Sequence, residues 1–178
     1  METLFYYLPA LESVRDFMEL GGKVLVLIAL LTLVMWALIF ERLFFLKARY
    51  PSMVRKALHI WESRPERKSW HAHRVREELV SVVGQALDQN LALVKTCVAL
   101  CPLMGLLGTV TGMISVFEVM AISGSGNPRS MAAGVSMATV PTMAGMVAAL
   151  SGLAMSAWLD GKAYRERELL GEHMTMDH

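Results

Sequence analysis

The chain has 178 residues, of which 54% are hydrophobic and 19% are charged, and its formal net charge is +1. So high an apolar fraction argues against an ordinary soluble domain and indicates a membrane protein. The net charge alone carries little information, whereas the positions of the charges carry more. No nucleic-acid partner is expected.

Three stretches contain no charged residue: 24–40, 96–117 and 131–159. The second and third are long enough to cross a hydrocarbon layer of ~30 Å, and the first lies near the lower length limit. Neither a basic leader nor a small-residue cleavage site accompanies the first stretch, so an uncleaved span is predicted. The expected fold is an all-α integral membrane protein with three transmembrane helices, of which the second and third extend into the cytoplasm.

The positions of Lys and Arg predict the orientation. Most of the 17 basic residues lie between Arg42 and Lys95 or after residue 159, and only Arg129 separates the second and third spans. Basic residues collect on the cytoplasmic side of a membrane. The N-terminus and the loop between the second and third spans are therefore expected on the outer side, and the long connection and the C-terminus in the cytoplasm.

The expected organisation follows the chain. An amphipathic segment on the outer interface ends at Gly21 and Gly22. The first helix continues through Glu41 and Arg42, which stand at the cytoplasmic mouth. In the connection, a break is expected around Pro65, and one continuous helix is expected from about residue 75 to residue 117. The predicted regions are 1–22 (outer segment), 23–46 (first transmembrane helix), 47–95 (cytoplasmic helical connection), 96–118 (second transmembrane helix), 119–130 (periplasmic loop), 131–159 (third transmembrane helix) and 160–178 (cytoplasmic extension).

Small and hydroxylated residues replace large apolar ones in the second span. At 100° per residue, four of them share one face: Gly105, Gly108, Thr109 and Gly112. Two of the glycines form a GxxxG pair, which lets helix backbones approach closely in a membrane. A smooth packing seam is predicted on this face.

The third span repeats the pattern, with Pro141 locally freeing a backbone carbonyl. Its small or hydroxylated face consists of Ala138, Thr139, Thr142, Gly145, Ala149 and Ser156. Two interpretations stay open: the faces only pack helices together, or they line a cavity or pore. The candidate pathway residues are Thr109, Thr139 and Thr142, and the candidate packing seam comprises Gly105, Gly108, Gly112, Gly145 and Ala149.

The second and third spans contain no Asp, Glu, His, Lys or Arg. Neither span therefore holds a group that binds and releases a proton at accessible pH, and in a proton channel that group would come from a partner. Cys97 and Cys101 are interpreted as small packing residues, and His71 and His73 as surface residues. No nucleophile–base pair, phosphate loop or metal-ligand cluster appears at usable spacing, so no enzyme activity, cofactor or metal is expected.

Two segments carry a family likeness. CPLMGLLGTVTGMISVF resembles the second-span signature of the MotA/TolQ/ExbB proton channel family, and AAGVSMATVPTMAGMVAAL resembles its third-span signature. The helix order, the large cytoplasmic connection and the short outer loop extend the resemblance over nearly the whole chain. Within the family, the chain is most similar to the short ExbB proteins of TonB-energising systems.

The resemblance implies a function and partners. It implies a homopentameric, channel-forming subunit of a bacterial inner-membrane motor that uses the proton-motive force to energise TonB-dependent transport across the outer membrane. An ExbD-like single-span partner would supply the proton-carrying Asp, and a TonB-like protein would receive the force. The family's two pore threonines fall on Thr109 and Thr142.

The chain also departs from the family pattern, and other functions compete. Met137 stands where a glutamate is common, Ser151 where a proline is common, and Pro141 is additional. The first change removes an acidic group from the third helix, and the others move the expected helix bend. The alternatives are a TolQ-like envelope motor, a MotA-like stator, which would need four spans and a larger cytoplasmic domain, and a non-conducting scaffold whose basic stretch binds anionic lipid.

Overall fold

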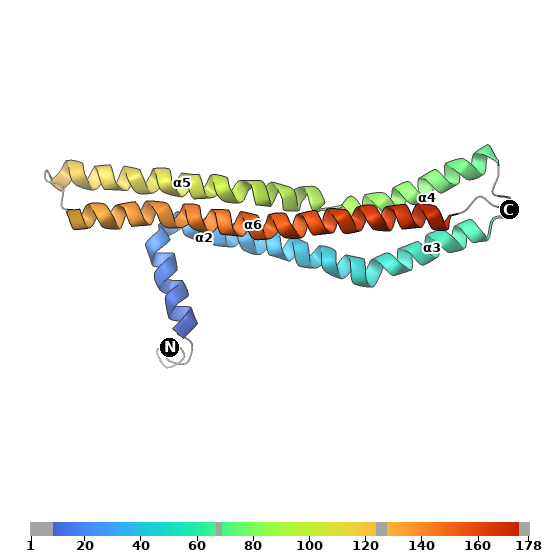
Figure 1. Cartoon of the computed structure of the whole chain (residues 1–178), viewed down its shortest axis with the longest axis horizontal. Helices are drawn as coiled ribbons and strands as arrows, with labels where there is room; N and C mark the ends of the chain where they lie inside the picture. The colour runs from blue at the N-terminus through green and yellow to red at the C-terminus, as the bar shows by residue number, and fades with distance from the viewer. Residues whose placement is uncertain (1–8, 67–68, 124–127, 175–178) are drawn as a thin grey trace. The chain divides into compact units, whose positions relative to one another are not determined.

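The computed structural model describes residues 9–66, 69–123 and 128–174, and over these ranges it contains helices and no strand (Figure 1). Three stretches contain helix long and apolar enough to cross a membrane: Gly21–Glu62, Trp70–Ile122 and Met131–His173. The predicted class, an all-α membrane protein with three spans, is confirmed. The helices are α2 (Pro9–Phe44), η1 (Phe45–Arg49), α3 (Tyr50–Glu62), α4 (Trp70–Asp88), α5 (Leu91–Ser123) and α6 (Pro128–His173).

Parts of four predicted regions lie outside the described residues. They are 1–8 of the outer amphipathic segment, 67–68 of the cytoplasmic connection, 124–127 of the outer loop and 175–178 of the C-terminal extension. The described chain forms two compact units, and α2, α5 and α6 each contribute to both. The first unit combines Met1–Met35 with Thr96–Gly152, and the second combines Trp36–Lys95 with Leu153–His178.

Helix α2 is kinked at Gly22. This residue has φ 63° and ψ −160°, a backbone conformation that L side chains rarely adopt and glycine adopts at no steric cost. The N-terminal part of α2 turns away from the remainder of the helix (Figure 1). The helix end predicted at Gly21 and Gly22 is therefore a sharp bend at Gly22, with helix on both sides of it.

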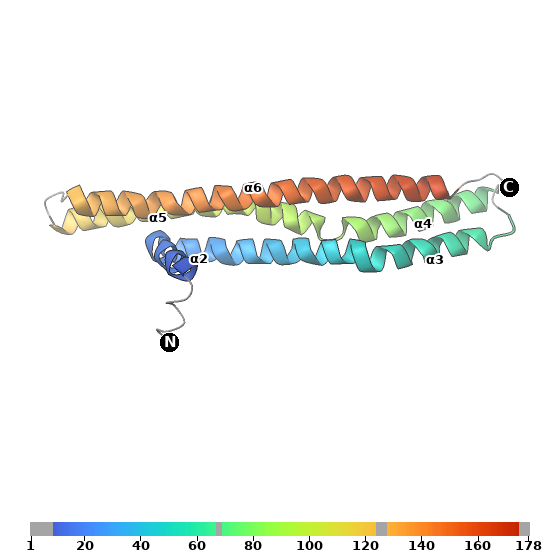
Figure 2. The ribbon, with the colours of Figure 1, turned by 60° about the horizontal axis from the view of Figure 1, so that its bottom comes forward.

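In the first unit, α5 and α6 pack with their backbones in contact, and they run side by side in both Figure 1 and Figure 2. A Cβ added to Gly105 would lie 2.9 Å from Cα of Thr142, and one added to Gly145 would lie 2.5 Å from the Cys101 carbonyl oxygen. At Gly112 the distance to Cα of Ala138 would be 2.7 Å. Since real Cβ contacts do not come this close, only glycine permits the approach.

The second unit contains α3, α4 and the last part of α6, and Trp61 of α3 and Leu159 of α6 are buried. The phenol of Tyr50 donates to the backbone carbonyl of Glu166 at 3.1 Å. Arg76 donates from Nη2 to the Gly171 carbonyl at 2.6 Å, which satisfies one of the unpaired carbonyls at the end of α6. Side-chain bonds to main-chain carbonyls thus fasten both α3 and α4 to α6.

The continuous helix predicted from about residue 75 to residue 117 is wrong. The chain leaves α4 at Asp88 and starts α5 at Leu91, with Gln89 and Asn90 between them. Asn90 has φ 62°, and Asn is among the few non-glycine residues that enter this left-handed region readily. Two helices with a break between them therefore replace the single predicted helix.

Two glycines of α6 offer a matched test of the close packing. Gly145→Ala places a methyl group against the Cys101 carbonyl, so the free energy of unfolding should fall by about 1–3 kcal/mol. Nothing lies within 4 Å of a Cβ added to Gly161, so Gly161→Ala should leave stability unchanged or raise it by up to about 1 kcal/mol. Unfolding of the purified protein in mixed micelles measures both. Equal effects of the two substitutions would contradict the close approach of α5 and α6.

Candidate functional site

Thr109 of α5 and Thr142 of α6 meet at the helix seam of the first unit. Their hydroxyl groups hydrogen-bond each other. Oγ1 of Thr142 also donates to the Gly105 carbonyl at 2.9 Å, and Oγ1 of Thr109 lies 3.4 Å from the same oxygen. Both side chains are half-buried. Two residues far apart in the sequence therefore form one small polar site between the uncharged stretches of the two helices.

The direction of these hydrogen bonds follows from proton counting. Each hydroxyl has one proton to donate. If Thr142 donates over the shorter distance to the Gly105 carbonyl, Thr109 donates to Thr142. The lone pairs of the Thr109 oxygen then remain available to an outside donor. The site can accept a hydrogen bond from a protonated group without exposing an unpaired donor.

Neighbouring residues hold this pair in place. Gly105 lets the Thr142 backbone come close enough for its hydroxyl to reach across to α5. Pro141 is fully buried, and its ring fills the space beside Gly108. Ala149 is buried in a cluster with Cys101 and Ala148. Of the predicted seam residues, Gly105 contacts the threonine pair directly, and none of the seam residues carries a polar side chain.

Thr139 lies apart from the pair. Its side chain is exposed, and its hydroxyl donates to the Ser136 carbonyl of its own helix at 3.2 Å. Thr111 is likewise exposed and bonds the Leu107 carbonyl at 3.0 Å. Of the three candidate pathway threonines, the chain by itself brings together Thr109 and Thr142 only.

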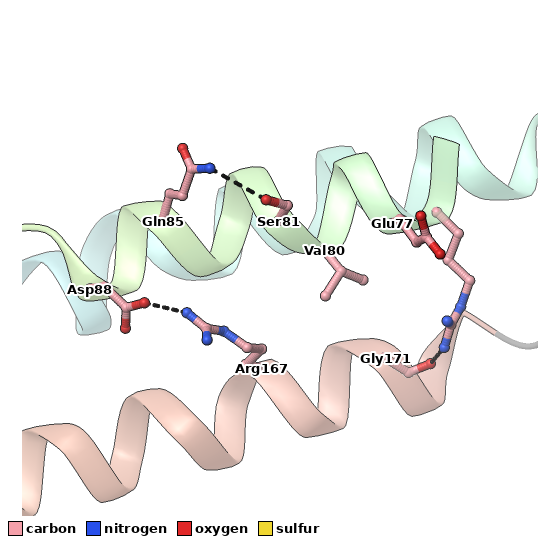
Figure 3. A pocket seen from close by; sticks show the side chains of 8 residues that line it. Glu77, Val80, Ser81, Gln85, Asp88, Arg167 and Gly171 are labelled. Atoms are coloured by element: carbon pink, nitrogen blue, oxygen red, sulfur yellow. Dashed lines mark hydrogen bonds and ion pairs between the residues drawn. The ribbon is translucent and has the colours of Figure 1, made fainter. Parts of the chain in front are cut away.

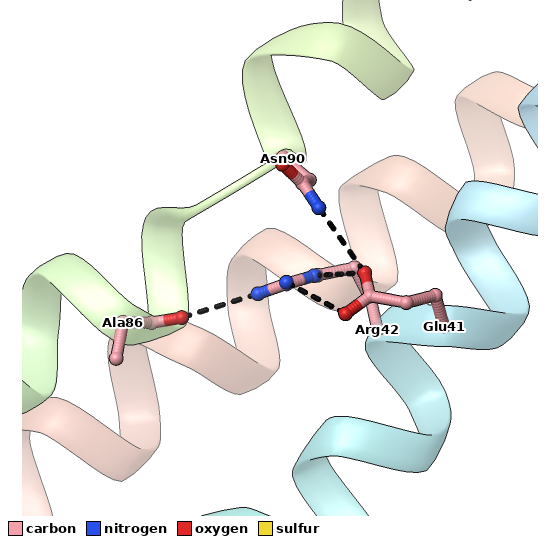
Figure 4. A network of polar contacts seen from close by, with 4 residues as sticks. All are labelled: Glu41, Arg42, Ala86 and Asn90. Carbon is pink, nitrogen blue, oxygen red and sulfur yellow. Dashed lines mark hydrogen bonds and ion pairs between the residues drawn. The ribbon is translucent and has the colours of Figure 1, made fainter.

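The second unit holds the other predicted polar pair. Arg42 is only 4% exposed, and its guanidinium donates to the Glu41 carboxylate from Nε at 2.7 Å and from Nη2 at 2.8 Å (Figure 4). A third donation reaches the Ala86 carbonyl at 3.1 Å, and the Asn90 amide donates to Glu41 at 3.3 Å. Sequence reasoning missed the last two residues. An Asn directly before an apolar helix start was the available signal for Asn90.

Within the described ranges, no group of three or more His, Cys, Asp or Glu side chains is arranged to hold a metal ion. Cys97 and Cys101 are free thiols. The polar chemistry that these ranges offer near the apolar seam is hydroxyl and carbonyl hydrogen bonding.

Comparison with known proteins gives a consistent picture. The model of the MotA/TolQ/ExbB proton channel family matches residues 47–172. Over 64 residues the chain is 44% identical to an ExbB-like 1 biopolymer transport protein of Synechocystis, a match covering 34% of this chain and 25% of the relative. Over 78 residues it is 37% identical to the biopolymer transport protein exbB1 of Vibrio cholerae, covering 41% and 34%. The matches therefore span about a third or less of each relative's length.

The threonine pair predicts a measurable difference between two hydroxyls of α6. Thr142→Val removes the donor to the Gly105 carbonyl and the acceptor for Thr109, so it should lower the free energy of unfolding by about 0.5–1.5 kcal/mol. Thr139→Val removes an exposed bond within one helix and should change it by less than about 0.5 kcal/mol. Unfolding in mixed micelles compares them, and a larger cost for Thr139→Val would contradict the assignment.

Proposed function

Since the chain belongs to the MotA/TolQ/ExbB proton channel family, we propose that it is the channel-forming subunit of a motor in the bacterial inner membrane. The motor uses the proton-motive force, together with an ExbD-like single-span partner, to energise TonB-dependent transport across the outer membrane. The observation that carries this proposal is the Thr109–Thr142 hydroxyl pair, set in two spans that contain no charged side chain.

The hydroxyl pair suits a proton carrier that the chain itself lacks. A carboxylate within the hydrocarbon costs about 2.5–3.5 kcal/mol on insertion scales. Hydroxyl groups lower that cost because a threonine hydroxyl can turn to donate to the ionised carboxylate or accept from the protonated acid. An Asp of the partner beside Thr109 would therefore be tolerated in both states, which a carrier that alternates between them requires.

The membrane potential supplies enough energy for this cycle. Moving one charge through 100 mV supplies about 2.3 kcal/mol, which biases a two-state element roughly fiftyfold. In the proposed cycle, protons enter from the outer side, neutralise the partner's Asp near the threonine pair, and leave toward the cytoplasm. Alternating protonation then shifts the partner within a ring of copies of this chain.

The proposed placement in the membrane follows the basic residues. The N-terminus and the loop 119–130 lie in the periplasm, and the connection 47–95 and the extension 160–178 lie in the cytoplasm. The spans are 23–46, 96–118 and 131–159. The pentamer rests on the resemblance to the family, because small-residue seams specify close packing and not a subunit count.

The choice of client is also part of the proposal. The two relatives are named biopolymer transport proteins of the ExbB type. Their names favour the transport motor over a TolQ-like envelope motor or a MotA-like stator. Deleting the gene in its native host separates these functions: a transport motor predicts loss of receptor-dependent uptake with an intact envelope, and a TolQ-like motor predicts leakage of periplasmic protein.

A non-conducting scaffold is the second candidate, and one observation favours it. Both hydroxyls of the pair find hydrogen-bond partners within the chain, and the seam leaves no room for a Cβ at Gly105, Gly112 or Gly145. Plain helix packing uses the same features. The scaffold predicts that removing a hydroxyl alters stability and nothing else.

Substitutions at two positions test the motor. Thr142→Val should abolish most uptake driven by the proton-motive force while the complex still assembles, because the shape is kept and the hydroxyl is lost. Thr142→Ser keeps the hydroxyl and should retain most uptake, and Thr139→Val is the control for a general loss of hydroxyl groups from α6. Uptake by cells carrying each variant, with the amount of complex in the membrane, is the measurement. Unimpaired uptake with Thr142→Val would refute the proposed role.

A further inference from the structure

The break between α4 and α5 is held from two sides. α4 ends at Asp88, Gln89 has ψ 137°, and Asn90 has φ 62° before α5 begins at Leu91. A helix break leaves unpaired carbonyls at the end of the first helix and unpaired N–H groups at the start of the second. The corresponding partial charges are negative at the end of α4 and positive at the start of α5.

Helix α2 contacts both sides of the break. Arg42 donates to the Ala86 carbonyl in the last turn of α4, and Glu41 accepts from the side chain of Asn90, directly before α5 (Figure 4). The two residues are themselves joined by a forked hydrogen bond. Adjacent residues of one helix thereby connect the end of α4 to the start of α5.

Helix α6 also contacts both sides of the break. Arg167 pairs with Asp88, the last residue of α4, across a shallow groove between the two helices (Figure 3). Asp160 accepts from Nζ of Lys95, near the start of α5, at 2.8 Å. Thus α2 and α6 each contribute one base on the α4 side and one acid on the α5 side. Arg42 near the end of α4 and Glu41 near the start of α5 match the helix dipoles. Arg167 and Asp160 instead neutralise Asp88 and Lys95, whose own charges oppose those dipoles.

We propose that Glu41 and Arg42 are positioning residues that, with Asp160 and Arg167, hold the α4–α5 break as a joint through which movement of α5 reaches α4. Arg42 is only 4% exposed. A buried arginine is not needed to pair with a solvated Glu41 at a channel mouth, but it is needed to fix the ends of two helices. The movement of α5 rests on the proposed motor function. The clamping of the break does not.

Amide hydrogen exchange at the break tests the clamp in the complete complex. Arg42→Gln removes the charge and the fork, so the amides of residues 86–92 should exchange about tenfold faster or more. Asn90→Gly keeps the left-handed backbone and loses only the side-chain bond to Glu41, so it should give a smaller acceleration. Arg74→Gln is the control, because Arg74 pairs with Glu77 in an exposed contact within α4. Unchanged exchange at 86–92 in both test variants would overturn the proposal.

A second readout separates positioning from general structural support. In membranes containing the partner subunits, Arg42→Gln should lower the amount of uptake per proton conducted by about fivefold or more. Arg42→Lys retains a charge and some of the donors and should recover part of that ratio. Proton flux and uptake falling in equal proportion would overturn the joint, because Arg42 would then act on proton conduction itself. If Arg42→Gln does not accumulate, Arg42→Lys and Asn90→Gly are judged by the same two outcomes.

The two proposals fail in distinguishable ways. If the unmodified complex conducts no protons, the motor function fails, while faster exchange in Arg42→Gln and Asn90→Gly still establishes the clamp. If the unmodified complex conducts protons and exchange at the break is insensitive to both substitutions, the clamp fails and the motor stands.

Discussion

Direct backbone contact between α5 and α6 is the constraint on which the first unit depends. In a membrane, an apolar helix face contacts lipid as favourably as it contacts another apolar helix. Association of the helices therefore needs close van der Waals contact and hydrogen bonds rather than burial of apolar area. Gly105, Gly112 and Gly145 supply that contact by leaving no side chain between the helices. A methyl group at any of them would meet atoms of the other helix at less than 3.0 Å, so the helices would have to shift at the contact that lets the Thr142 hydroxyl reach the Gly105 carbonyl.

The polar chemistry of each unit follows from its surroundings. In the first unit, the two threonine hydroxyls and one carbonyl satisfy one another, which keeps a small polar site stable without a charge in the spans. The second unit instead uses full charges, with arginines bonded to carbonyls and carboxylates at helix ends. The hydroxyl contacts carry no net charge, whereas the charged contacts join helix ends.

Much of this could be read from the sequence, because uncharged length and the spacing of small residues are local properties. The three spans and the faces carrying Gly105, Thr109 and Thr142 come from those properties alone. The α4–α5 break could not be predicted in the same way, because buried Leu87 and Leu91 keep the helical i, i+4 spacing across it. Asn90 decides the break through its backbone conformation, which the apolar pattern does not encode.

A helical projection could not predict the positions of Thr139 and Arg42, for two different reasons. Thr139 and Thr142 fall on the same broad face of α6, but only Thr142 of these two threonines hydrogen-bonds to α5, whereas Thr139 bonds to its own helix. Arg42 donates to the main-chain carbonyl of Ala86. Every residue has such a carbonyl, so the sequence does not indicate which one Arg42 binds. Such contacts become visible only when the helices are placed side by side.

The mass of the intact complex, purified gently from its native membrane through a C-terminal tag, tests the central claim most directly. The account predicts a ring of this chain that holds a smaller number of single-span subunits, each bearing an aspartate in its span. Repeated recovery of a homo-oligomer without such a partner, under equally mild conditions, would contradict it, because the threonine site would then have no proton carrier to serve.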